Sequence, residues 1–173
     1  MSDLRATVGP VVAAAHLADG AMPALSEMEF ALVIQSNAYH RWIARCAAAA
    51  GGQGLSAMDV QILHAVNHRG RTKSLTELTM MFNIDDTHVV AYALKKLEAQ
   101  RLVKAGRRGK EKTVEITPAG AALCLRYREV RESLLVGGMK ALGVDEARLS
   151  ELAALMRMLS GQYDQASRAA ASL

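Results

Sequence analysis

The basic side chains of this chain are concentrated in its middle segment. Residues 68–112 contain eleven Lys and Arg and five Asp and Glu, out of 21 and 17 in the whole chain of 173 residues. The segment therefore has a net charge of +6, whereas the remaining residues together have −2. Positive charge gathered in one segment is typical of proteins that bind nucleic-acid phosphates. Charge alone leaves one alternative open, a solvated basic face without a partner.

Three sets of residues in this segment are candidates for contacting double-stranded DNA, each at a different part of it. A helix predicted from Thr87 to Glu98 is thin enough for the major groove, where base edges offer hydrogen-bond partners. Its outward-facing residues are Thr87, His88, Ala91, Tyr92, Lys95 and Lys96. The hydroxyl, imidazole and phenol groups could reach bases, and the two lysines could reach phosphates. The second set, Arg107, Arg108, Lys110 and Lys112, lies at a predicted hairpin tip and would contact the flanking backbone or the minor groove. The third set, Ser74 and Thr76, could add phosphate contacts at the start of the preceding helix. Simple surface exposure is the alternative for each residue.

Histidines and cysteines suggest other chemistry, but their spacing supports little of it. His64 and His68 are four residues apart, the spacing of a zinc pair on one helix face, with His40 as a possible third ligand. No cysteine or acidic cluster completes that set, so we predict no metal and no other cofactor. Cys46 and Cys124 lie in apolar stripes, which favours buried thiols over redox sensors and over a disulfide.

Motifs of several enzyme classes are missing. The sequence contains no G-x-S-x-G, no G-x-x-x-x-G-K-[ST] and no H-E-x-x-H, so we predict a protein that is not an enzyme. It also lacks a run of about 18 apolar residues and a basic start followed by an apolar segment, which argues against a membrane span and a secretory signal. We therefore expect a cytoplasmic protein that does not bind membranes.

The elements that position these residues are predicted to be mainly helical, since the chain is rich in Ala and has three prolines. Residues 1–24 are predicted to be a flexible arm, with a short helix near residues 10–18. The sequence S-x-x-E/D marks helix starts at Ser26, Ser56 and Ser74, Asp86 can cap the helix from Thr87, and Thr117-Pro118 opens another helix. Residues 101–105 and 113–116 read as the two strands of a β-hairpin.

Two helical patterns follow the hairpin. Leu123, Tyr127, Val130 and Leu134 share one face of a long helix that is expected to end or kink at Gly137-Gly138. After a cap at Asp145, a heptad-like seam predicts a dimer interface formed by Leu149, Leu152, Met156, Leu159 and Tyr163. The alternative is that this seam packs against the first helix of its own chain.

The order helix, helix, turn, helix, hairpin, helix is that of a winged helix-turn-helix. The run that starts at Leu75 resembles MarR-type transcriptional regulators in its Leu-Thr-Glu-Leu opening, the Lys-Lys-Leu-Glu end of the next helix, the Leu-Val strand entry and the Thr-Pro-Ala-Gly restart. The resemblance extends over residues 26–168. Two departures concern the residues that would contact DNA. The hairpin tip reads Arg107-Arg108-Gly109-Lys110-Glu111-Lys112 where the family usually has Asp-x-Arg, and Tyr92 stands where many relatives have arginine.

The resemblance implies a mainly α fold with a small β-hairpin wing, flanked by long dimerisation helices. It divides the chain into an arm (1–24), an N-terminal dimerisation helix and linker (25–55), a winged helix-turn-helix domain (56–120) and C-terminal dimerisation helices (121–173). It also implies a homodimer that binds a pseudo-palindromic operator, usually as a repressor, and a pocket for a small-molecule effector. Candidate pocket residues are Phe30, Ile34, Tyr39, Trp42, His64 and Met80, each of which could instead be ordinary core. A winged helix that serves as a protein-protein adaptor is the alternative function.

Overall fold

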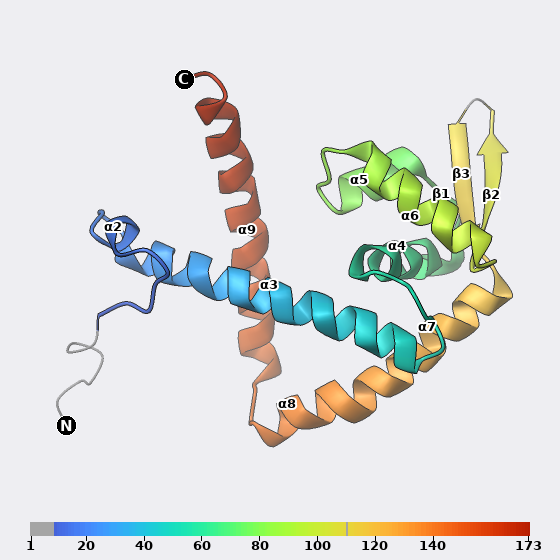
Figure 1. The fold of residues 1–173 in the computed structure, drawn as a ribbon, viewed down its shortest axis with the longest axis horizontal. Coiled ribbons are helices and arrows are strands. Elements are labelled where there is room, and N and C mark those ends of the chain that lie inside the picture. Colours follow the sequence, from blue (N-terminus) through green and yellow to red (C-terminus); the bar gives the residue numbers. More distant parts are fainter. Residues whose placement is uncertain (1–8, 110) are drawn as a thin grey trace. The chain divides into compact units, whose positions relative to one another are not determined.

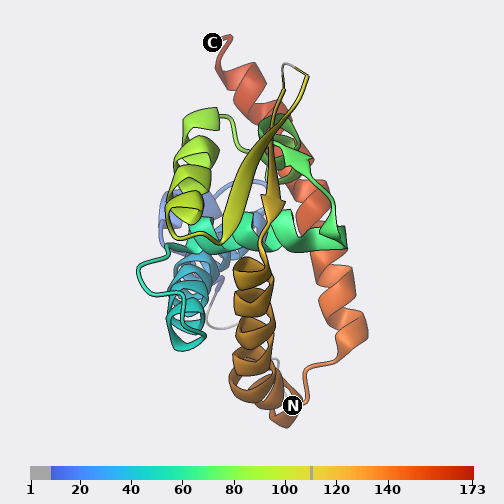
Figure 2. The same cartoon turned by 90° about the vertical axis from the view of Figure 1, so that its right-hand side faces the viewer.

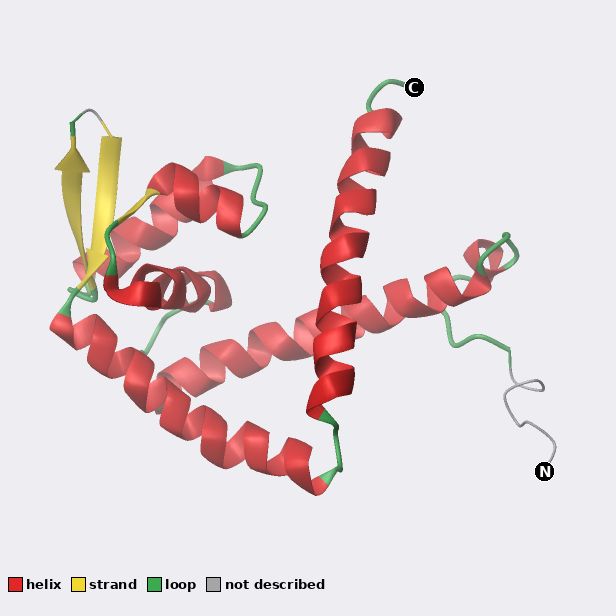
Figure 3. Cartoon of the chain, turned by 180° about the vertical axis from the view of Figure 1, so that it is seen from behind, coloured by secondary structure: helices red, strands yellow, loops and turns green. Residues whose placement is uncertain are grey.

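A computed structural model describes residues 9–109 and 111–173 (Figure 1). Helices dominate it, and its strands form one small antiparallel sheet, as Figure 3 shows. The elements are α2 (Ala15–Ala18), α3 (Pro23–Ala49), α4 (Ala57–Asn67), η1 (His68–Gly70), β1 (Lys73–Ser74), α5 (Leu75–Met81), α6 (Thr87–Ala99), β2 (Val103–Arg108), β3 (Glu111–Ile116), α7 (Pro118–Arg131), the π-helical η2 (Glu132–Val136), α8 (Gly137–Ala141) and α9 (Glu146–Ala170). The predicted mainly α fold with a small hairpin wing is confirmed.

The chain divides into two compact units, Met1–Tyr127 and Arg128–Leu173. The first unit contains α2 to β3 and most of α7. The second contains the last residues of α7 and the helices η2, α8 and α9. Among the described helices, none combines the length and the apolar character needed to cross a lipid bilayer.

Helix α4 is the centre of the first unit, because it contacts α3, α5, α6 and β3 (Figure 2). Its apolar residues Ile62 and Val66 are 0% exposed. Leu78 of α5 and the pair Val90 and Leu97 of α6 are also 0% exposed. These helices are too short to be stable alone. The apolar area that they bury together, rather than the helix propensity of each, stabilises the helix-turn-helix.

The wing is a hairpin of β2 and β3 in which Val103 pairs with Ile116 at the base and Arg108 with Glu111 at the tip. The two-residue strand β1 extends it to a sheet of order β1-β3-β2, with Lys73 opposite Val114. Strand β1 was not predicted, because two residues are too few to show an alternating pattern.

The predicted caps are confirmed at five helix starts. Ser56 with Asp59 and Ser74 with Glu77 form complete capping boxes. The side chains of Asp86, Thr117 and Asp145 accept hydrogen bonds from backbone amides of α6, α7 and α9. These bonds satisfy amides that would otherwise lack partners at the first turn.

The predicted start of the first long helix at Ser26 is wrong. Helix α3 begins at Pro23, and the Ser26 hydroxyl donates to the carbonyl of Leu17 at 2.9 Å instead of capping the helix. Proline is well suited to the first helical position, since its missing N–H has no partner there. Helix α2, within the predicted 10–18 segment, precedes it. The arm predicted over residues 1–24 therefore extends too far, and residues 1–8 lie outside the described part.

The predicted break at Gly137-Gly138 is also misplaced. The helix continues through these glycines as α8, after the π-helical η2, and it ends at Ala141. The chain reverses at Gly143, whose φ of +67° suits glycine and strains other residues. The break therefore comes where the backbone requires a left-handed residue.

Candidate nucleic-acid interface

One face of α6 is buried and the other is exposed. Val90 and Leu97 lie in the core, whereas the predicted contact residues Thr87, His88, Ala91, Tyr92 and Lys95 are all exposed or half-buried at the helix surface. Tyr92 is 71% exposed, which is unusual for an aromatic side chain. The Asp86 carboxylate accepts from the His88 amide at 2.8 Å and fixes the first turn. Helix α6 therefore presents an exposed face that includes the polar groups of Thr87, His88, Tyr92 and Lys95.

The wing adds cations beside this face. Arg107 and Lys112 are paired across the hairpin, and both are exposed. No ion pair is found for either within residues 9–109 and 111–173. Arg108 donates to the Glu111 carboxylate at 2.9 Å, a bond that lowers the pKa of Glu111. Arg108 is thus partly neutralised, and the predicted contact residue Lys110 lies outside the described residues.

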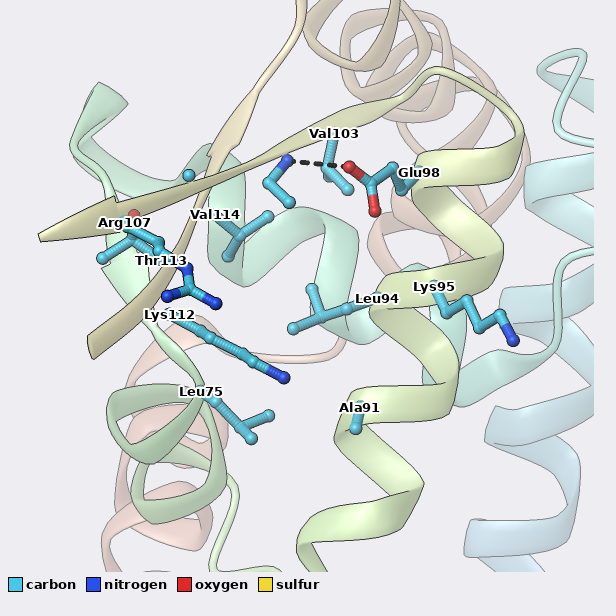
Figure 4. A pocket seen from close by; sticks show the side chains of 12 residues that line it. Leu75, Ala91, Leu94, Lys95, Glu98, Val103, Arg107, Lys112, Thr113 and Val114 are labelled. Carbon is cyan, nitrogen blue, oxygen red and sulfur yellow. Dashed lines mark hydrogen bonds between the residues drawn. The ribbon is translucent and has the colours of Figure 1, made fainter. Parts of the chain in front are cut away.

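A hollow of about 360 Å³ separates α6 from the wing (Figure 4). Its floor is apolar, with Leu94, Val103 and Val114, and Arg107 and Lys112 extend over it from the hairpin. The Glu98 carboxylate accepts from the Ala105 amide of β2 at 3.1 Å and ties the two elements together (Figure 4). Helix and wing therefore form one concave surface with positive charge on its wing side.

Ser74 is a correction to the predicted contacts. It is 2% exposed, and its hydroxyl accepts from the Glu77 amide at 3.2 Å. The capping box that made Ser74 recognisable in the sequence is the reason that its oxygen is unavailable to a phosphate. Thr76, two residues further on, is exposed as expected.

Lys96 is a second correction. Its ammonium lies 2.7 Å from the carboxylate of Asp59, which is 2% exposed, so this cation is paired inside the protein. Lys95 and Lys96 look alike in the sequence, because nothing local shows that α4 provides a buried partner for one of them.

Sequence reasoning also counted Lys73 as part of the basic segment, but the side chain is 1% exposed. Its ammonium donates to the carbonyls of Val66, His68 and Arg71. Burial lowers the pKa of Lys73, and the nearby Arg71 lowers it further. No sequence signal distinguishes a lysine of this kind from a surface lysine. Its role here is to hold the turn between α4 and β1.

Comparisons with known proteins agree with this geometry. A family profile described as a winged helix DNA-binding domain matches residues 55–120. Residues 55–120 therefore have the fold of a winged helix domain. No curated sequence is significantly similar to the chain.

Solved structures extend the likeness beyond the winged helix domain. The transcriptional regulator BldR from Sulfolobus solfataricus is 26% identical, and the match covers 79% of this chain and 96% of BldR with a TM-score of 0.57. NMB1585, a MarR family regulator from Neisseria meningitidis, is 15% identical, with 82% and 94% covered and a TM-score of 0.63. CouR from Rhodococcus jostii RHA1, bound to p-coumaroyl-CoA, is 12% identical, with 76% and 90% covered and a TM-score of 0.64. The chain thus has the fold of MarR-type transcriptional regulators.

The candidate effector residues fall into two groups around the winged helix domain. Tyr39 and His64 line a hollow of about 450 Å³, together with Ile43, Val60, Gln61, Ala65, His68, Met81, Phe82 and Tyr127. Phe30, Ile34, Trp42 and Met80 are not among the residues that line this hollow, and their place in an effector pocket stays a prediction. Met80 is 76% exposed. The helical period of the sequence cannot show where along α3 the hollow opens, because its other walls come from α4, α5 and α7.

The imidazole of His64 meets the ring of Tyr127 edge-on, with centroids 4.6 Å apart. Burial lowers the pKa of His64 and favours its neutral form. His68 lines the same hollow, whereas His40, the third residue of the zinc hypothesis, does not. Within the described residues, no group of three or more His, Cys, Asp and Glu is placed to hold a metal ion.

Both cysteines of the chain are buried and free, as predicted. The Cys46 thiol donates to the Tyr127 carbonyl at 3.6 Å. Burial raises the pKa of the Cys124 thiol to about 11. Because the thiolate is the reactive form, this environment disfavours oxidation of Cys124.

The predicted dimer seam lies on α9 in the second unit. Leu149, Leu152, Met156 and Tyr163 are 38–47% exposed, Leu159 is half-buried, and no residue of α9 is buried. Leu155 and Met158 are exposed as well. The helix thus carries more uncovered apolar surface than a solvated helix requires.

Proposed function

We propose that this protein is a sequence-specific transcriptional regulator that binds double-stranded DNA. The observation that carries the proposal is the concave surface on which the exposed face of α6 adjoins the wing cations Arg107 and Lys112. An α-helix fits the major groove of B-DNA, and the neighbouring phosphates require positive charge beside it. The protein is proposed to act in the cytoplasm and to have no enzymatic activity.

The contacts proposed for this surface are of two kinds, contacts to base edges and contacts to phosphates. Thr87, His88 and Tyr92 occupy the exposed N-terminal half of α6, where short or planar groups meet base edges. Lys95 on α6 and Arg107 and Lys112 on the wing meet phosphates. A phosphate contact is independent of sequence, whereas a base contact discriminates by about 1–3 kcal/mol.

The DNA-binding form is proposed to be a homodimer joined through the α9 seam, Leu149, Leu152, Met156, Leu159 and Tyr163. A two-fold pair of winged helix domains places two α6 helices in successive major grooves of a pseudo-palindromic operator. Occupation of a promoter in this way blocks transcription, so repression is the proposed outcome.

The hollow beside His64 is proposed to bind a small-molecule effector that releases DNA. It joins aromatic and apolar walls, Phe82 and Tyr127 among them, to a few polar groups, as is typical of ligand sites. The relative CouR is described as bound to p-coumaroyl-CoA. The lining includes residues of α4 and of the end of α5, so a ligand there contacts elements that support α6.

Selection of bound duplexes from a random pool tests the proposal. The expected result is an enriched, pseudo-palindromic sequence that the protein binds at least about 1,000-fold more tightly than a scrambled duplex, the lower end for specific regulators. His88→Ala and Tyr92→Ala should each reduce this ratio and leave the salt dependence nearly unchanged. Without enrichment, and with equal affinity for every duplex, the adaptor function would be favoured.

A further inference from the structure

An ion pair joins the first turn of α4 to the C-terminal half of α6. The Lys96 ammonium lies 2.7 Å from Asp59 Oδ2, and the side chains are 31% and 3% exposed. The same oxygen accepts from the Ser56 amide at 2.7 Å. A carboxylate with two donors on one oxygen is strongly oriented, because charge-assisted hydrogen bonds are short and directional.

The position of Asp59 is fixed independently of α6. Its amide donates to the Ser56 hydroxyl at 3.2 Å, which completes the capping box, and its neighbours Val60 and Ile62 are buried. Asp59 is therefore held in place by bonds within its own helix start as well as by Lys96. Lys96 is the flexible partner, and the carboxylate determines where its ammonium goes.

Adjacent residues of an α-helix point about 100° apart. Lys95 accordingly faces solvent, and Figure 4 shows its ammonium directed away from the wing, whereas Lys96 faces α4. The apolar contacts of Val90 and Leu97 hold α6 against the core without strong directional preference. The ion pair adds a directional restraint on rotation of α6 about its axis. Buried pairs contribute more to defining one arrangement than to net stability in several known systems.

We propose that Asp59 is a positioning residue for DNA recognition: it fixes the rotation of α6 through Lys96, and it withholds the Lys96 charge from DNA phosphates. This inference rests on the proposed function, because it assigns roles within the same surface. Lys95 and Lys96 have the same chemistry, and they are proposed to differ in role because Lys96 has a partner on another helix.

The test compares the salt dependence of binding for Lys95→Met, Lys96→Met and Asp59→Asn in the full chain. Fluorescence anisotropy is measured with the selected operator and with a scrambled duplex at several salt concentrations. Each phosphate contact contributes about 0.9 to the slope of log affinity against log salt. Lys95→Met should lower this slope by about 0.9 per bound subunit on both duplexes.

Lys96→Met should leave the slope unchanged and reduce the preference for operator over scrambled duplex about tenfold, a mid-range value for coupled groups. Asp59→Asn keeps an oxygen for the Ser56 amide and frees Lys96. It should therefore lose preference to a similar degree and steepen the slope on scrambled duplex by up to about 0.9 per subunit. A residue with a merely structural role would not steepen the slope.

The outcomes separate the two proposals. If the unmodified protein shows no operator preference, the proposed function fails. If it does show preference but Lys96→Met flattens the slope as Lys95→Met does, Lys96 contacts phosphate and the positioning role is overturned. Thermal unfolding identifies a variant that fails to fold. In the case that Asp59→Asn does not fold, Lys96→Met and Lys96→Gln decide, since the glutamine amide can still donate to Asp59 and should restore part of the preference.

Discussion

The ammonium of Lys73 donates a hydrogen bond of 2.6 Å to the backbone carbonyl of His68, just beyond the last residue of α4. Two further bonds, to the carbonyls of Val66 and Arg71, use the remaining protons of the ammonium. The turn that they enclose contains Arg69 and Gly70, both with left-handed φ angles of 61° and 57°. One buried cation thus satisfies carbonyls at a helix end and holds a strained turn.

Lys73→Met should destabilise the protein by about 2–4 kcal/mol, because one buried and two partly buried carbonyls would be left without their charged donor. Methionine keeps the apolar stem, so reduced packing is a small part of the effect. Urea unfolding followed by circular dichroism measures it. Lys140→Met, at an exposed lysine, is the matched control and should change stability little. Equal stability of both variants would show that the three bonds contribute nothing net.

Gly120→Ala should destabilise the winged helix domain by about 1–3 kcal/mol, the usual cost of overpacking. A Cβ at this position would overlap the Leu102 carbonyl oxygen and lie 2.7 Å from Ile116 Cδ1, so α7 would have to move away from the sheet. Gly161→Ala is the control, because apart from its chain neighbours and the nearby backbone of α9, no atom lies within 4 Å of a Cβ there. That change should stabilise α9 by up to about 1 kcal/mol. Thermal unfolding of the two variants should therefore shift in opposite directions.

Arg107→Ala with Lys112→Ala should weaken binding to operator and scrambled duplex alike. Neither cation has an ion pair in the described part of the chain, so removing each phosphate contact should lower the salt slope by about 0.9. Arg108→Ala should have a smaller effect, since Arg108 is already bound to Glu111. Anisotropy titrations measure the slopes. Arg128→Ala, at an exposed residue of α7, is the control for the change in net charge. A weakening confined to the operator would mean that the wing reads bases.

Leu152→Glu with Met156→Glu should convert the proposed dimer to monomers that bind operator weakly. Carboxylates in a heptad-like seam would be desolvated without partners, which opposes association. Size-exclusion chromatography with light scattering gives the mass. Glu151→Gln, an exposed residue on the same helix, serves as the control. A double variant that stays dimeric would place the dimer interface elsewhere.

Cys124 should react slowly with iodoacetamide in the native protein. With a pKa of about 11, about one thiol in a thousand is ionised at pH 8. The folded thiol holds its proton more tightly than the unfolded thiol, so the contribution of Cys124 to stability is fully present well below pH 9 and is lost as the pH rises through about 9 towards 11. Alkylation rates with and without denaturant test the first point, and unfolding at about pH 8 and about pH 10.5 the second. Cys46→Ser and Cys124→Ser should each leave the DNA affinity and its response to peroxide unchanged. Peroxide release abolished in either variant would instead identify a redox sensor.

The sequence by itself determined the elements and their order. Ser56, Ser74, Asp86 and Asp145 each cap a helix with a group only two or three residues away, so the signal is local. The buried face of α6 follows from helical period, and the hairpin from alternation around a turn. These features depend mainly on short-range sterics and hydrogen bonds, which the neighbouring residues largely specify, although Ser26 shows that a local capping pattern need not form a cap.

Only the tertiary structure decided which side chains remain available to contact DNA or a ligand. Lys95 and Lys96 are adjacent lysines, and their difference arises from Asp59, 37 positions before Lys96 in the chain. Lys73 is buried because the end of α4 offers it carbonyls, and Tyr39 rather than Phe30 reaches the hollow because of where α4 and α7 lie. The free energy of burying a charge depends on partners that come together only on folding, so no local pattern can predict it.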